Sequence, residues 1–296
     1  MVLDPVAIFV LGWGMKGAAL ATITGQIVSA LLAVYYLFRP KSFRLKRVSF
    51  KPDAEILKHV LPLGISSFLT QVSIVVIMAV MNNVLVIYGA GSKYGADIPM
   101  TVVGIVMKVF QIVISVVVGI AAGAQPIVGY NYGAGLWRRV KLIFRTMMAA
   151  EFSVGLVSLI CFEVFPVQII SVFGSEDGLY NEFAVLAFRV FLGGIVLCCI
   201  QKSCSIFLQS MGKPALSMLL SLLRDFVLSV PLTLVLPRLF GVTGALYSGP
   251  AADVISFGAA VLCMAAVFRK LNRLEDGEVA LYGASQGGLA VERKIC

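Results

Sequence analysis

Charged residues are scarce in this chain. Asp, Glu, Lys and Arg make up 13% of 296 residues, whereas hydrophobic residues make up 59%, and the mean hydropathy is +0.97. A soluble domain of this length usually carries about a quarter charged residues, and so much apolar surface cannot be hidden inside a water-facing globule. The scarcity of charge excludes a soluble fold and predicts an all-α, polytopic membrane protein.

Residues that build metal and disulfide sites are also scarce. Six cysteines show no CxxC spacing, and five of them fall inside apolar runs, where a thiol behaves as a small apolar residue. His59 is the only histidine, and a lone histidine is more often packed or solvated than a metal ligand. We therefore predict neither a metal site nor a cofactor.

The motifs of soluble enzymes are absent as well. The sequence holds no HExxH, GxSxG, Walker A loop or Gly-rich dinucleotide turn, so we predict no enzymatic activity and no catalytic residue. An intramembrane enzyme would have only Glu151 and the thiols Cys198, Cys199 and Cys204 to work with. Without a nucleotide site, an ion gradient or a partner protein must supply the energy for any transport, which indicates a secondary transporter.

Long apolar runs are what the chain has in abundance. A helix needs roughly 20 apolar residues to cross the hydrocarbon core of a membrane. Seven runs satisfy this rule, at 17–38, 56–81, 98–124, 140–165, 183–209, 214–237 and 241–268.

The net charge of +9 is concentrated in alternate predicted loops, with clusters within 39–58, 138–145 and 269–294. Basic loops mark the cytoplasmic side of a membrane protein. The pattern predicts a plasma-membrane protein with a cytoplasmic carboxyl terminus, and it explains the basic charge without nucleic acid.

Two helix starts look alike, GMKGAAL at 14–20 and GVTGAL at 241–246. Duplicated helical units are common in transporters. With a six-helix unit, the chain would hold one complete unit and the last helix of a preceding one.

The segment QPIVGYNYGA at 125–134 follows the apolar run 98–124 and precedes Arg138 and Arg139. It resembles the signature after the eighth helix of the multidrug and toxic compound extrusion (MATE) transporters. The matching residues are Gln125, Pro126, Gly129, Tyr130, Asn131 and Gly133. Weaker matches at 12–22, 61–64 and 241–253 occur in the family's order and extend the resemblance over about residues 2–270.

The resemblance implies an organisation by lobes. MATE transporters have twelve helices in two six-helix lobes, so this chain would be a carboxy-terminal fragment from the sixth helix to the twelfth. The expected parts are the end of helix five and helix six at 1–38, a basic inter-lobe loop at 39–55, the carboxy-terminal lobe at 56–270, and a disordered cytoplasmic tail at 271–296. A missing or separately encoded amino-terminal lobe is the expected partner, besides the bilayer.

A charge near the middle of a membrane is costly unless it is paired or hydrated, so each is a functional candidate. Glu151 and Asp253 are our candidates for coupling to Na⁺ or H⁺. The predicted pairs join Lys108 to Glu151, and Arg224 or Lys202 to Asp253; static structural ion pairs remain the alternative. Spans 56–81 and 183–209 lack carboxylates, a pattern that resembles the DinF-like branch, whose coupling aspartate lies in the first helix.

Substrate contacts are expected in a cleft lined by Gln71, Asn82, Lys108 and Gln111, and the resemblance implies small organic cations as substrates. The predicted function is a cation- or proton-coupled antiporter that exports drugs or toxic compounds by alternating access. Two alternatives stay open: a lipid-linked saccharide flippase of the same superfamily, and a non-functional transporter remnant.

Overall fold

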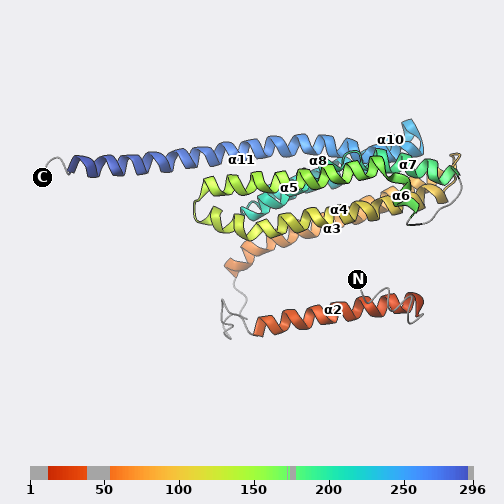
Figure 1. Cartoon of the computed structure of the whole chain (residues 1–296), viewed down its shortest axis with the longest axis horizontal. Coiled ribbons are helices and arrows are strands. Elements are labelled where there is room, and N and C mark those ends of the chain that lie inside the picture. The colour runs from red at the N-terminus through yellow and green to blue at the C-terminus, as the bar shows by residue number, and fades with distance from the viewer. Residues whose placement is uncertain (1–12, 39–53, 172, 174–177, 293–296) are drawn as a thin grey trace. The chain divides into compact units, whose positions relative to one another are not determined.

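The computed structural model describes residues 13–38, 54–171, 173 and 178–292. The chain divides into two compact units, Met1–Lys58 and His59–Cys296. Every regular element in the described ranges is a helix (Figure 1). The all-α class predicted from the sequence is confirmed.

The first unit contains α2 (Gly14–Phe38), whose described side chains are almost all exposed. Its first residue, Gly14, has a φ of 55°, a left-handed conformation that glycine adopts without strain. The predicted end of helix five and most of the basic loop at 39–55 lie outside the described residues.

The second unit is a bundle that begins in α3 (Ala54–Ala90). The following elements are α4 (Asp97–Gly133), α5 (Trp137–Val164), α6 (Pro166–Ser171), α7 (Gly178–Leu192), α8 (Ile195–Ser210), α9 (Pro214–Leu222), a π-helix η3 (Leu223–Leu228), α10 (Ser229–Phe240) and α11 (Val242–Glu292). Across the described residues, six segments are long and apolar enough to cross a membrane, or seven if the bent pair α7–α8 counts as one. The prediction of a multi-pass helical bundle is therefore confirmed.

Helix α8 lies at the centre of this bundle, in contact with α4, α5, α9 and α11. The buried apolar residues form two separate clusters. A polar layer lies between the two clusters. On each of three helices, a buried or half-buried charged residue separates a residue of the first cluster from a residue of the second. These residues are Glu151 between Met147 and Phe162 on α5, Lys202 between Cys199 and Cys204 on α8, and Asp253 between Leu246 and Ala260 on α11.

The structure corrects the predicted end of the third span. Helix α4 does not stop at residue 124 but continues through Pro126 to Gly133. Proline removes one backbone donor, yet the flanking turns remain helical, and the Asn131 amide donates to the Ile127 carbonyl at 2.8 Å. The helix stops before Gly135, whose φ is 74°. In a helix packed along α5 and α8, one lost backbone bond is tolerated.

A second difference concerns the predicted tail at 271–296. Helix α11 continues past residue 271 to Glu292. Leu271 is buried in the second apolar cluster, and Glu275 forms an ion pair with Lys141 of α5. The first turn beyond residue 270 is therefore fixed by packing and charge, which composition alone did not indicate.

The turn between α10 and α11 explains the glycines of the repeated sequence. Gly241 has a φ of 64°, as Gly14 has one of 55° at the matching position. A Cβ on Gly244 would lie 2.7 Å from the Pro237 nitrogen and still closer to the Leu236 carbonyl. Only a residue without a side chain permits this approach of the two helices.

We expect Gly244→Ala to destabilise the second unit because the new methyl group meets backbone rather than a movable side chain. Overpacking of this kind typically costs about 1–3 kcal/mol. The control is Gly258→Ala on the same helix, where a Cβ meets nothing within 4 Å. Thermal unfolding in detergent, followed by circular dichroism, would contradict this account if the two variants had equal melting temperatures.

Candidate functional site

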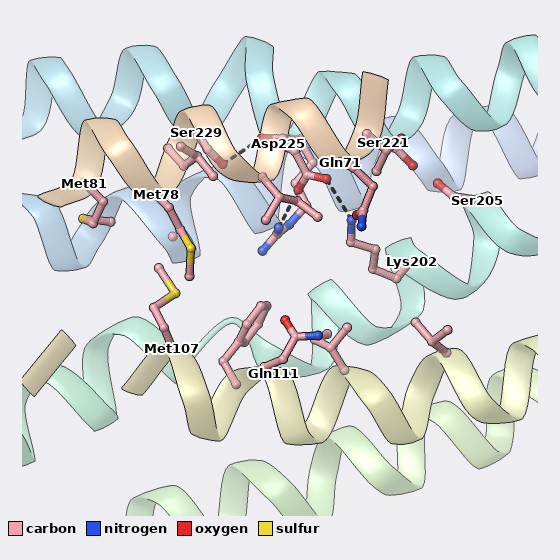
Figure 2. Close-up of a pocket in the computed structure, with 18 of the residues that line it drawn as sticks. Gln71, Met78, Met81, Met107, Gln111, Lys202, Ser205, Ser221, Asp225 and Ser229 are labelled. Carbon is pink, nitrogen blue, oxygen red and sulfur yellow. Dashed lines mark hydrogen bonds and ion pairs between the residues drawn. The ribbon is translucent and has the colours of Figure 1, made fainter. Parts of the chain in front are cut away.

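A pocket of about 400 Å³ opens in the second unit. Helices α3 and α4 provide Met78, Met81 and Met107 beside the amides of Gln71 and Gln111, and Figure 2 shows Met107 and Gln111 of α4 across the pocket from Met78 and Met81 of α3. Helices α8, α9, η3 and α10 provide a polar wall. Its side chains include Lys202, Ser205, Ser221, Arg224, Asp225 and Ser229. The pocket is amphipathic, with an apolar and a charged side.

Four charged side chains form a connected network at the polar wall. Lys202 Nζ donates to Asp225 Oδ2 at 2.8 Å, and Arg224 Nη1 donates to Asp225 Oδ1 at 2.7 Å. Arg224 Nε donates to Asp253 Oδ1 at 2.8 Å. Arg224 therefore bridges two carboxylates, and two cations balance two anions in a region that excludes most water.

The π-helix η3 (Leu223–Leu228) places adjacent residues Arg224 and Asp225 in this network. The Arg224 carbonyl oxygen accepts hydrogen bonds from the backbone N–H of Ser229 and also from the Ser229 hydroxyl, the latter at 2.7 Å. Single-turn π segments within α-helices are rare and often occur at functional sites. Here the segment connects the pocket wall to α11.

The bend between α7 and α8 makes room for Asp253. The two helices differ in direction by 41°. A Cβ on Gly194, at this break, would lie 2.7 Å from Asp253 Oδ2 and 3.2 Å from Pro250 Cα. The glycine lets α11 approach the amino-terminal end of α8, where helix polarity favours a carboxylate.

Glu151 lies apart from this network. Its side chain is 0% exposed, and neither carboxylate oxygen is in hydrogen-bonding geometry with any group in the described part of the chain. Ser203 of α8 is the polar side chain that interacts with it. An ionised carboxylate without a partner is strongly disfavoured in such a place, so Glu151 needs a proton or a cation.

The structure places the sequence candidates differently. Gln71 and Gln111 line the pocket, whereas Asn82 and Lys108 are exposed and do not. The proposed pairing of Lys108 with Glu151 is wrong, because Lys108 lies on the exposed face of α4 and Glu151 is enclosed. The two residues lie on differently oriented faces of their helices, and counting residues along a span does not reveal this rotation.

Arg224 pairs with Asp253, while Lys202 pairs with Asp225 rather than Asp253. The central role of Asp225 was missed, although the charged doublet at 224–225 inside an apolar run was the signal for it. The family-motif residues lie in the last turns of α4, outside the pocket lining. Within the described ranges, no group of three or more His, Cys, Asp and Glu side chains could hold a metal ion.

Fold and pocket together define a multi-pass helical membrane bundle with an amphipathic pocket. The sequence model of the MatE family matches residues 62–235. The chain belongs to the MatE family, which confirms the resemblance seen in the sequence.

Curated relatives share part of the sequence, and solved structures share the fold. The multidrug export protein MepA of Staphylococcus aureus (strain NCTC 8325 / PS 47) is 24% identical over 266 residues, which cover 88% of this chain and 56% of that protein. MepA of Staphylococcus saprophyticus is 26% identical over 263 residues, with the same coverage. The crystal structure of MATE in complex with MaL6 has a TM-score of 0.80 at 23% identity, over 92% of this chain and 60% of that one. The chain thus spans about half the length of the curated relatives it matches.

We expect Arg224→Gln to destabilise the protein strongly, because it leaves Asp225 and Asp253 without their shared cation. Breaking a buried pair typically costs about 3–5 kcal/mol. The double variant R224Q/D253N should lose less stability than the sum of the losses in its two single variants. The exposed pair Lys93–Glu182, with side chains 59% and 54% exposed, provides the control, and Glu182→Gln should change the melting temperature little. Strict additivity in the R224Q/D253N cycle would contradict the bridging role of Arg224.

Proposed function

We propose that this chain forms the carboxy-terminal lobe of an ion-coupled antiporter that exports drug-like amphiphiles by alternating access. The observations that support it most directly are an amphipathic pocket and, apart from it, an enclosed carboxylate without a cationic partner, in a chain of the MatE family. The names of the relatives, which are multidrug export proteins, favour drug export over the flippase alternative. A separately encoded or preceding amino-terminal lobe would complete the substrate path.

In this proposal, Glu151 is the coupling carboxylate of the lobe. Because it has no cation of its own, it would exchange a proton or Na⁺ more readily than Asp225 or Asp253, which form ion pairs with Lys202 and Arg224. Loading and release of the ion would change the contact between α5 and α8. That contact is close, since a Cβ on Gly155 would lie 3.0 Å from Val196 Cα.

The basic loops support an orientation in the plasma membrane with the carboxyl terminus in the cytoplasm. An inward gradient of H⁺ or Na⁺ would then drive outward movement of the substrate. Proton and sodium gradients can be imposed separately on vesicles, so the coupling ion can be identified directly.

We expect Glu151→Gln to abolish gradient-driven transport without reducing the amount of protein in the membrane, because glutamine keeps the shape but binds neither ion. The measurement is uptake of a fluorescent amphiphile into inside-out vesicles that contain the chain, with H⁺ or Na⁺ gradients imposed in turn. Glu163→Gln is the matched control, since Glu163 lies on the same helix but forms an exposed pair with Arg189.

Unchanged coupling in Glu151→Gln would remove this residue from the mechanism. An absence of gradient-driven uptake by the unaltered chain, at normal insertion, would refute transport by this chain on its own.

A further inference from the structure

The charges at the polar wall are not equally accessible from the pocket. The side chains of Lys202 and Arg224 are 15% and 14% exposed, whereas those of Asp225 and Asp253 are only 4% exposed. The carboxylates are thus covered by the cations that neutralise them. A molecule that enters the pocket meets ammonium and guanidinium groups first.

The hydrogen bonds lead to the same conclusion. Both oxygens of Asp225 accept a bond from a cation. Arg224 uses Nε and Nη1 for the two aspartates, while its Nη2 donates to no group in the described residues. Lys202 Nζ donates one bond and has three protons. Within the described residues, both oxygens of Asp225 and one oxygen of Asp253 are engaged by cations, and Arg224 and Lys202 retain spare donors.

The methionines of α3 and α4, called the methionine wall here, suit the body of an amphiphile. Met78, Met81 and Met107 provide flexible, polarizable contacts that adapt to varied shapes. Phe110 lies on the same side, with its ring centroid 5.8 Å from Arg224 Cζ, so the cation lies over an aromatic face. The volume of about 400 Å³ falls within the range of drug-sized sites, about 300–1,000 Å³.

We propose that this pocket binds amphiphilic acids, with a carboxylate, phosphate or sulfonate at Arg224 Nη2 and Lys202 Nζ and an apolar body along the methionine wall. The inference rests on the proposed function, because it takes the pocket to be a substrate site. It changes the substrate class implied by the family resemblance, since a ligand with only a cationic head would face two cations whose counter-ions are already engaged. Charge-assisted bonds to the acid would use the spare donors.

The test compares three probes with one body and different heads: pyrene butanoate, its neutral butanamide, and a pyrenylbutyl trimethylammonium. Each is equilibrated by dialysis against the whole chain in phosphatidylcholine nanodiscs, with empty nanodiscs as the blank. We expect the butanoate to bind at least about tenfold more tightly than the trimethylammonium, a difference of about 1.4 kcal/mol.

Lys202→Gln should weaken binding of the butanoate about tenfold and leave that of the neutral butanamide unchanged, which shows that the pocket is intact. Lys202→Arg should restore binding. The control Lys93→Gln removes an exposed lysine outside the pocket and should have no effect. If Lys202→Gln fails to fold, the pair K202Q/D225N removes one cation and one anion together and provides the same comparison.

Competition separates an amphiphilic acid from a free anion. Displacement of the butanoate by phosphatidate but not by inorganic phosphate at equal concentration supports the proposal, whereas displacement by inorganic phosphate alone overturns it. The proposal is also overturned if the trimethylammonium binds more tightly than the butanoate, or if Lys202→Gln weakens the binding of all three probes equally. Because binding is measured without a gradient, these outcomes are independent of whether the chain transports.

Discussion

The second unit depends on keeping charge neutral in the middle of an apolar bundle. Arg224 meets this constraint by bonding to Asp225 of its own helix and Asp253 of α11, while Lys202 of α8 bonds to the other oxygen of Asp225. Three helical segments are thereby joined between the two apolar clusters. None of these charges would be stable there alone, so the mutual orientation of α8, η3 and α11 follows from their pairing.

Irregular backbone makes this pairing possible. The π-helix η3 carries the consecutive residues Arg224 and Asp225, which bond to each other and to Asp253 and Lys202 on two neighbouring helices. The break before α8 and the missing side chain of Gly194 leave space for Asp253. In a membrane, non-helical or strained backbone is tolerated where protein or a polar cavity surrounds it. Both irregularities lie next to the pocket, where that condition is met.

Span positions, the all-α class and the family could be predicted from the sequence, because each rests on the length, order and composition of apolar runs. The charged residues within spans could also be found, since they interrupt those runs. Their partners could not: Lys108 and Glu151 are on plausible neighbouring helices, yet one is exposed and the other enclosed. Pairing depends on the rotation of each helix about its axis, and tertiary packing sets that rotation. The passage of α4 through Pro126 escaped prediction for the same reason, since contacts with α5 and α8 outweigh a local breaker.

The buried acids of this lobe fall into two kinds. Asp225 and Asp253 each form an ion pair with a cation, Lys202 and Arg224 respectively, which suits them to a structural role in the pocket wall. Glu151 of α5 has no such cation and interacts with Ser203 of α8, so in the proposed mechanism its charge would change with the ion it binds. Since Lys202 and Ser203 are consecutive residues of α8, the helix that contacts Glu151 also carries a cation of the pocket. A change of ion at Glu151 that shifts α8 would therefore move Lys202, and one helix would connect the ion to the ligand without direct contact between them.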